Sequence, residues 1–145
     1  AQIGINVPIQ IRSEFLQLER AAAQMKPGHW IFNPYTCNAV GSFVKRMPWD
    51  SVAVDVTEAN YDPDARVFAF KRPNGKLTVV VSNRTPGERR FALSIGDRSD
   101  AQWKGYRYTP DNAGERTLGV PVGELHGANL QPVLPRLSWE FWEEQ

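Results

Sequence analysis

With 145 residues, the chain is long enough for one domain with its own core and too short for a (β/α)8 barrel, which needs roughly 250 residues. Its 17 Lys and Arg nearly balance its 16 Asp and Glu, so the net charge of +1 excludes an electrostatic surface for nucleic acid or an acidic membrane and favours a neutral partner. The single cysteine, Cys37, excludes an internal disulfide and any thiolate-based zinc site.

The first part of the chain is predicted to hold one strand and two helices. Apolar residues alternate at period two through IGINVPIQI, residues 3–11, which indicates a half-buried edge strand. The spacing of apolar residues over 14–25 predicts a first helix. A second helix is expected after Asn33 as its cap, with Pro34 at the first helical position and an end before Pro48.

From residue 51 onward, short β-type runs are separated by clusters of Gly, Pro, Asn and Asp. The clearest signal is RPNGKLTVVVSNRT, residues 72–85, where a tight turn precedes a strand of alternating pattern. We therefore expect a mainly β fold, an antiparallel β-sandwich with one or two short N-terminal helices. Residues 111–135 are expected to form a long loop with room for one short strand. The expected strands are 51–56, 65–70, 76–83, 89–95, 104–109 and 137–142.

The chain is expected to be a single β-sandwich domain over residues 1–145. Its helical N-terminal segment would cover about 13–46 and its strands about 51–142. Because it starts without Met and in the middle of a pattern, we expect a fragment of a larger multidomain enzyme. No apolar run approaches the ~20 residues of a membrane span, so no membrane partner is expected.

No arrangement of residues indicates a catalytic site. Two carboxylates held roughly 5 to 9 Å apart could cleave a glycoside, but Glu140 faces away from its aromatic neighbours in the last expected strand. Glu143 and Glu144 are expected in a frayed, solvated C-terminus. His29 and His126 lack a nucleophile motif beside them. We expect a non-catalytic chain without a cofactor, since a small enzyme would need two of these carboxylates to converge in a cleft.

A group of acidic residues raises the question of calcium, which prefers carboxylate and carbonyl oxygens. The group lacks the glycine-bearing spacing of a calcium loop, so a solvated turn between two strands is the expected structure and no metal site is predicted. The sequence leaves open whether Ca²⁺ binds. The acidic residues are Asp55, Glu58, Asp62 and Asp64.

Aromatic residues make up 11% of the chain, which is more than a core of this size requires. Most of the rings are expected in the core, and some at the surface. Because sugar rings stack on Trp and Tyr, an exposed group of rings would suit a neutral polysaccharide, or else an interface with a neighbouring domain. The candidate carbohydrate-binding residues are Trp103, Tyr106, Tyr108 and Trp142.

Three segments resemble retaining glycoside hydrolases of clan A, of the family 30 and family 39 kind. Residues 33–56 resemble the helix and first strand that leave the catalytic barrel. VFAFKRPNGKLTVVVSNRT, residues 67–85, resembles their hairpin of two apolar strands, and LPRLSWEFW, residues 134–142, is similar to the closing strand. The matching residues in the first segment are Tyr35, Gly41, Phe43, Pro48 and Ser51.

This resemblance implies a C-terminal β-sandwich accessory domain of a polysaccharide-degrading enzyme. The two catalytic glutamates of such enzymes belong to the barrel and match no position here. One expected function is that of a carbohydrate-binding module, which would hold an extracellular or periplasmic glycoside hydrolase on a neutral plant-type polysaccharide. The alternative is a structural sandwich that buttresses the catalytic domain of the same polypeptide without binding sugar. Trp139 and Trp142, where the family has simpler side chains, favour the first.

Overall fold

The computed structural model describes residues 34–109 and 119–145. The described residues belong to one compact unit, Pro34–Gln145. The strand expected at 3–11 and the helix expected at 14–25 lie outside the described residues, so they stay predictions, as does the single domain. In the part that is described, no helix is long and apolar enough to cross a membrane.

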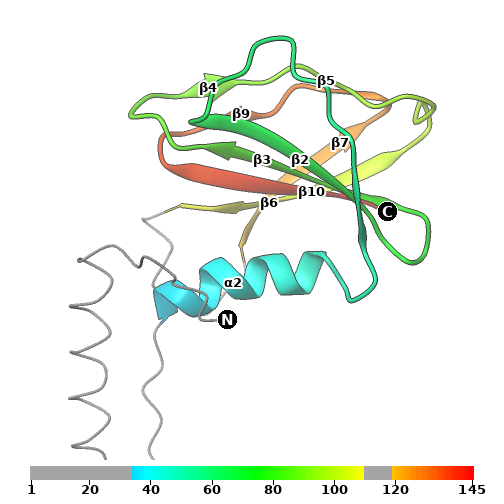
Figure 1. Ribbon diagram of the computed structural model, residues 1–145, viewed down its shortest axis with the longest axis horizontal. Helices are drawn as coiled ribbons and strands as arrows, with labels where there is room; N and C mark the ends of the chain where they lie inside the picture. Colours follow the sequence, from blue (N-terminus) through cyan, green and yellow to red (C-terminus); the bar gives the residue numbers. More distant parts are fainter. Residues whose placement is uncertain (1–33, 110–118) are drawn as a thin grey trace, which may run out of the picture. The chain divides into compact units, whose positions relative to one another are not determined.

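A six-stranded antiparallel sheet forms the centre of the described unit (Figure 1). Its strand order is β1-β2-β3-β10-β6-β7, so the last strand of the chain lies in the middle of the sheet. The strands are β1 (Val52–Val54), β2 (Ala65–Lys71), β3 (Leu77–Asn83), β6 (Gln102–Tyr108), β7 (Val120–His126) and β10 (Ser138–Glu144).

A smaller layer and one helix lie on opposite sides of this sheet (Figure 1). The smaller layer consists of two short antiparallel ladders, β4 with β9 and β5 with β8. The fold is therefore mainly β with antiparallel pairing, as predicted, and is consistent with a β-sandwich. The remaining elements are β4 (Arg89–Arg90), β5 (Leu93–Ser94), β8 (Asn129–Leu130), β9 (Val133–Leu134) and α2 (Pro34–Arg46).

The main core fills the space between the large sheet and the smaller layer. Period-two alternation turns one face of β3, β6 and β10 toward Leu130 of β8 and Leu134 of β9. Trp103 is fully buried, and its indole nitrogen donates a hydrogen bond to the carbonyl of Gly127 at 2.9 Å. This satisfies the one polar atom of the ring. The buried members of the core are Val79, Val81, Trp103, Leu130, Leu134 and Trp142.

The opposite face of the large sheet packs against α2, which begins at Pro34 and ends at Arg46 as predicted. Pro34 suits the first helical position because its missing N–H would have no partner there. Phe43 packs edge-on against Phe141, with ring centroids 4.9 Å apart. The end of the helix is anchored where the hydroxyl of Thr78 donates to the carbonyl of Arg46 at 2.9 Å.

The region expected to be a loop, residues 111–135, contains three strands among its described residues: β7, β8 and β9. The pairing of β6 with β7 shifts register between Gly105 and Tyr106, and Gly123 has a φ of 122°. Such an irregularity interrupts the alternation by which a strand is recognised. These three strands were not predicted because glycines interrupt the apolar alternation of β7 and because β8 and β9 are only two residues long.

Candidate functional site

The four predicted carbohydrate-binding residues do not share one exposed surface. Trp103 and Trp142 are 0% and 4% exposed in the main core, and Tyr108 is 8% exposed. Tyr106 is half-buried on the helix face, with its ring centroid 3.9 Å from the guanidinium carbon of Arg46. β6 and β10 are internal strands with both faces covered, which explains the burial. Sugar binding by these residues stays a prediction, without an exposed platform to support it.

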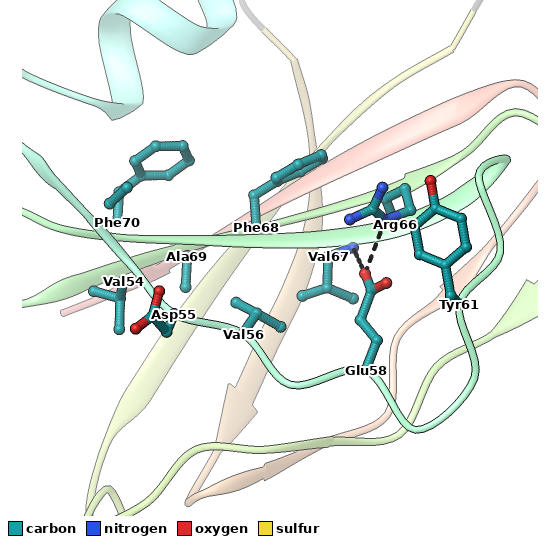
Figure 2. Close-up of a pocket in the computed structure, with 11 residues that line it drawn as sticks. Val54, Asp55, Val56, Glu58, Tyr61, Arg66, Val67, Phe68, Ala69 and Phe70 are labelled. Atoms are coloured by element: carbon teal, nitrogen blue, oxygen red, sulfur yellow. Dashed lines mark hydrogen bonds and ion pairs between the residues drawn. The ribbon is translucent and has the colours of Figure 1, made fainter.

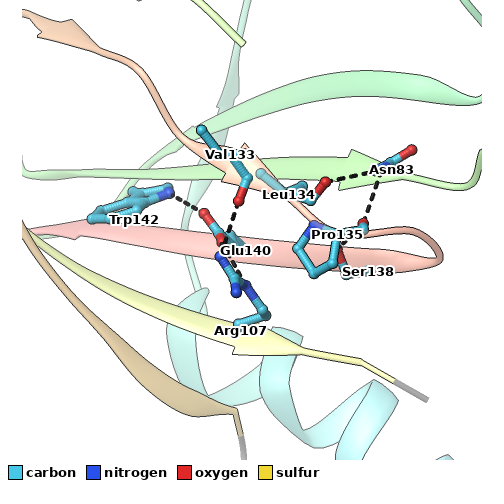
Figure 3. Close-up of polar contacts among 8 residues, drawn as sticks. All are labelled: Asn83, Arg107, Val133, Leu134, Pro135, Ser138, Glu140 and Trp142. Carbon is cyan, nitrogen blue, oxygen red and sulfur yellow. Dashed lines mark hydrogen bonds and ion pairs between the residues drawn. The ribbon is translucent and has the colours of Figure 1, made fainter. Parts of the chain in front are cut away.

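Glu140 is a buried structural carboxylate (Figure 3). It is 1% exposed, and its Oε1 accepts a hydrogen bond from Nε of Arg107 at 2.7 Å. Its Oε2 accepts another from the indole nitrogen of Trp142 at 2.9 Å. Burial raises the pKa of Glu140, while the hydrogen bond and charge of Arg107 oppose this shift. Both oxygens are occupied, so this carboxylate serves the fold.

The C-terminal end of the chain is ordered in β10, and the expectation of a frayed end was wrong. Glu144 is 8% exposed, and its carboxylate accepts a hydrogen bond from the backbone N–H of Leu77 at 2.8 Å. It also lies 3.3 Å from Arg98. Arg72 donates a further hydrogen bond to the backbone carbonyl of Glu144. The strand is held from both sides because it is central in the sheet.

Two of the acidic residues considered for calcium, Asp62 and Asp64, have separate partners. Asp62 accepts a hydrogen bond from the backbone of Asp64 at 2.9 Å and lies 3.5 Å from Arg89. Asp64 lies 3.9 Å from Arg84. Among the residues that the structure describes, no group of three or more His, Cys, Asp or Glu could hold a metal ion.

A groove of about 450 Å³ opens where the chain after β1 separates from β2 (Figure 2). We call it the β1–β2 groove, and its polar and aromatic lining consists of Asp55, Glu58, Tyr61, Arg66, Phe68 and Phe70. Pairing of β1 with β2 reaches only from Lys71 to Ala69. Beyond that point, Oε1 of Glu58 accepts a hydrogen bond from the backbone N–H of Val67 at 3.2 Å. A side chain thus takes the place of the missing strand.

Arg66 lies between two aromatic rings at the rim of this groove. Its guanidinium carbon is 4.6 Å from the ring centroid of Tyr61 and 5.7 Å from that of Phe68. Tyr61 is 70% exposed and Phe68 is 43% exposed. Nε of Arg66 donates to Oε1 of Glu58 at 3.1 Å, and this bond and the one from Val67 hold the pKa of Glu58 below its usual value, the bond from Val67 most strongly.

Sequence reasoning missed this group because its members come from a turn and a strand. Glu58 was considered only as a calcium ligand, and Phe68 only as part of a strand. The available signal was the placement of Tyr61 among turn residues and the period-two spacing of Arg66, Phe68 and Phe70 on one face of β2. That spacing does not reveal that the neighbouring strand ends early.

A larger hollow of about 750 Å³ lies between the β2–β3 hairpin and residues 89–96 of the smaller layer. Its walls include the core-facing side chains of Val67 and Leu77 and those of Phe91 and Leu93. These side chains are half-buried extensions of the main core. The hollow is therefore the open end of the sandwich, and its lining also includes the ion pair of Asp62 with Arg89.

One stripe of α2 is apolar and exposed. Val40 and Val44 are one helical turn apart and are 57% and 67% exposed. Phe43 and Arg46 of the same helix contact the sheet, so the stripe faces away from it. In the turn after the helix, Trp49 is 92% exposed. Exposed apolar side chains grouped in this way are typical of interaction surfaces.

Solved structures with this fold come from larger enzymes. An endoxylanase of glycoside hydrolase family 30 from Clostridium papyrosolvens C71 has a TM-score of 0.61 at 16% identity, over 77% of this chain and 28% of that chain. Xylanase C of family 30 from Talaromyces cellulolyticus has a TM-score of 0.58 at 17% identity, over 74% and 23%. A family 44 xyloglucanase from Paenibacillus polymyxa has a TM-score of 0.60 at 16% identity, over 84% and 24%. The chain thus spans about a quarter of the length of these proteins.

These structural matches show that the fold is shared. A match of the sequence to a family model shows a relationship in sequence as well. No curated protein matches the chain. The resemblance expected from the sequence is confirmed for family 30, because residues 50–112 match the glycosyl hydrolase family 30 beta sandwich domain.

Proposed function

We propose that this chain is a non-catalytic accessory domain of a glycoside hydrolase, and that its α2 helix packs against the catalytic domain of the same polypeptide. The observation that carries the proposal is the exposed apolar stripe formed by Val40 and Val44. In a free domain this stripe would face water, whereas a neighbouring domain would bury it and so stabilise the contact.

The size and names of the similar structures support this proposal. The chain aligns with about a quarter of each protein, and those proteins are described as xylanases or a xyloglucanase. A parent protein of this kind would act on a polysaccharide. Because such a polymer does not cross a cell membrane, the parent enzyme would work outside the cell or in the periplasm.

The experiment uses the complete gene product, in which the proposal requires a linked catalytic domain. Val44→Asp is expected to lower the midpoint of thermal unfolding of that domain, because a charge in the contact would lose its water. In the isolated 145-residue chain the same change should leave the midpoint unaltered, since Val44 is exposed in the unit that the structure describes. Calorimetry of both proteins measures the two effects.

A matched control is Arg90→Asp in β4, whose side chain is 83% exposed in the smaller layer. This change also introduces an aspartate, and it should leave the catalytic domain unaffected. A gene product without a second domain, or an equal midpoint in the Val44→Asp protein, would contradict the proposal.

Binding of a neutral polysaccharide is a second candidate function. The burial of Trp103 and Trp142 gives it no support, but the exposed rings of Tyr61 and Phe68 in the β1–β2 groove favour it. In this function the domain would raise the local concentration of substrate around the linked catalytic domain.

A further inference from the structure

We propose that the β1–β2 groove binds a neutral oligosaccharide, with Tyr61 and Phe68 as stacking surfaces and with Arg66 and Glu58 as hydrogen-bonding partners. This proposal rests on the second candidate function, polysaccharide binding, and gives that function a location. It does not depend on whether α2 packs against a catalytic domain. The proposed site consists of exposed aromatic residues, unlike the earlier candidates in β6 and β10, whose rings are covered.

The aromatic part of the groove suits the C–H faces of a sugar. Tyr61 is 70% exposed and Phe68 is 43% exposed, so each ring offers surface to a ligand. Arg66 lies within 4.6 and 5.7 Å of their centroids and so limits their movement. Rings that are already ordered lose little conformational entropy when a ligand stacks on them.

The polar part of the groove suits neighbouring hydroxyl groups. Nε of Arg66 and Oε1 of Glu58 bind each other at 3.1 Å, which orients both side chains. Within the described ranges 34–109 and 119–145, no hydrogen bond reaches Oε2 of Glu58 or the two terminal nitrogens of Arg66. One acceptor and a pair of donors are therefore open to a ligand that carries both kinds of group.

Charge and backbone pairing favour a neutral sugar over an anionic polymer or an added strand. The charges of Arg66 and Glu58 compensate each other, and Asp55 adds a further acceptor to the lining. An added strand would need the N–H of Val67 at the edge of β2, and Glu58 already occupies it.

The volume of about 450 Å³ lies within the range of small-molecule sites, roughly 300 to 1,000 Å³.

The test is an NMR titration of the ¹⁵N-labelled 145-residue chain with xylohexaose and, separately, with cellohexaose. We expect saturable shifts of the backbone amides of Glu58, Tyr61 and Val67 with at least one of them. Tyr61→Ala should raise the Kd about tenfold, because it removes one stacking surface. Arg66→Met should also raise the Kd, since it removes the donors while it retains the aliphatic stem.

The matched control is Trp49→Ala, which removes an aromatic ring that is 92% exposed and lies outside the groove. It should leave the Kd unchanged, and the dispersion of the spectra verifies that every variant is folded. Binding that is equally strong in Tyr61→Ala and Arg66→Met would overturn the groove as the site but leave carbohydrate binding standing. If neither oligosaccharide produced saturable shifts in the folded chain, both the groove and carbohydrate binding would be rejected.

Discussion

Arg46 is a buried cation with incomplete hydrogen bonding. It is 1% exposed, its Nε lies 3.9 Å from Glu143, and its guanidinium carbon lies 3.9 Å from the ring centroid of Tyr106. Among the described residues, its Nε and Nη1 have no hydrogen-bond partner. Burial lowers its pKa, although Glu143 and Tyr106 oppose the shift. A buried guanidinium with incomplete hydrogen bonding stabilises the fold more through the packing of its side chain than through its charge.

The change Arg46→Met tests this interpretation. Methionine retains an unbranched apolar stem but lacks the guanidinium that lies over Tyr106, while the cost of burying a charge disappears. We expect the free energy of unfolding in urea to rise or to fall by less than about 1 kcal/mol. Arg46→Ala, which also removes the packing, should be less stable than Arg46→Met. A loss of more than about 2 kcal/mol in Arg46→Met would show that the charge itself stabilises the fold.

The raised pKa of Glu140 predicts how the stability of the fold depends on pH. Its pKa in the folded chain lies above its ordinary value of 4.5, chiefly because of burial, so the folded state holds this proton more tightly than the unfolded state. The resulting stability is fully present below the unfolded pKa and is lost as pH rises through the folded pKa. Glu140→Gln lacks this titration. The stability of the unmodified chain relative to the variant should therefore fall from pH 4 toward neutral pH.

Urea unfolding of both proteins at several pH values measures this difference. Glu58, whose pKa is lowered, titrates with the opposite sign, but it is present in both proteins and cancels in the comparison. A difference in stability that stays constant, or that grows with pH, would contradict a raised pKa at Glu140.

At the scale of elements, the contact between β6 and β10 depends on a missing side chain. Gly105 pairs with Trp142, and a Cβ atom built on it would lie 2.6 Å from Cη2 of that indole. The same atom would lie 2.8 Å from Cγ2 of Val122 in β7. The indole of Trp142 lies over the backbone of β6 because this position has no side chain.

Gly105→Ala is therefore expected to lower the free energy of unfolding by about 1 to 3 kcal/mol, through overpacking of a buried contact. The matched control is Gly87→Ala, where an added Cβ would meet nothing within 4 Å. That change should alter stability by less than about 0.5 kcal/mol. Thermal and urea unfolding of the two variants test the argument, and equal stabilities would refute it.

At the scale of the whole molecule, β10 connects the two halves of the large sheet. It pairs with β3 on one side and with β6 on the other. It supplies Trp142 to the main core and Phe141 to the helix face. β10 therefore completes the large sheet, and the hairpin of β2 and β3 joins β6 and β7 only through it.

Removal of residues 138–145 should leave a chain without cooperative unfolding, because both cores lose members and β3 and β6 lose their common partner. Near-ultraviolet circular dichroism and the dispersion of NMR spectra measure this loss. Removal of Gln145 alone is the control, since it breaks only a side-chain bond to the backbone of Glu143 and one backbone bond to Gln102. A cooperative unfolding transition in the longer deletion would contradict a central role for β10.

The sequence by itself determined the class of fold. Its alternating runs and turn residues predicted the long strands β2, β3, β6 and β10, and Pro34 marked the start of α2. Local patterns suffice for these elements because a strand or helix is specified by its own spacing of apolar residues.

Only the tertiary structure decided which aromatic rings meet water. Trp103 and Trp142 looked available in the sequence, but the smaller layer covers them. Tyr61 and Phe68 lie together because β1 leaves β2 early. Exposure is a property of what packs above a residue, and that partner comes from a distant part of the chain, so no local pattern contains it.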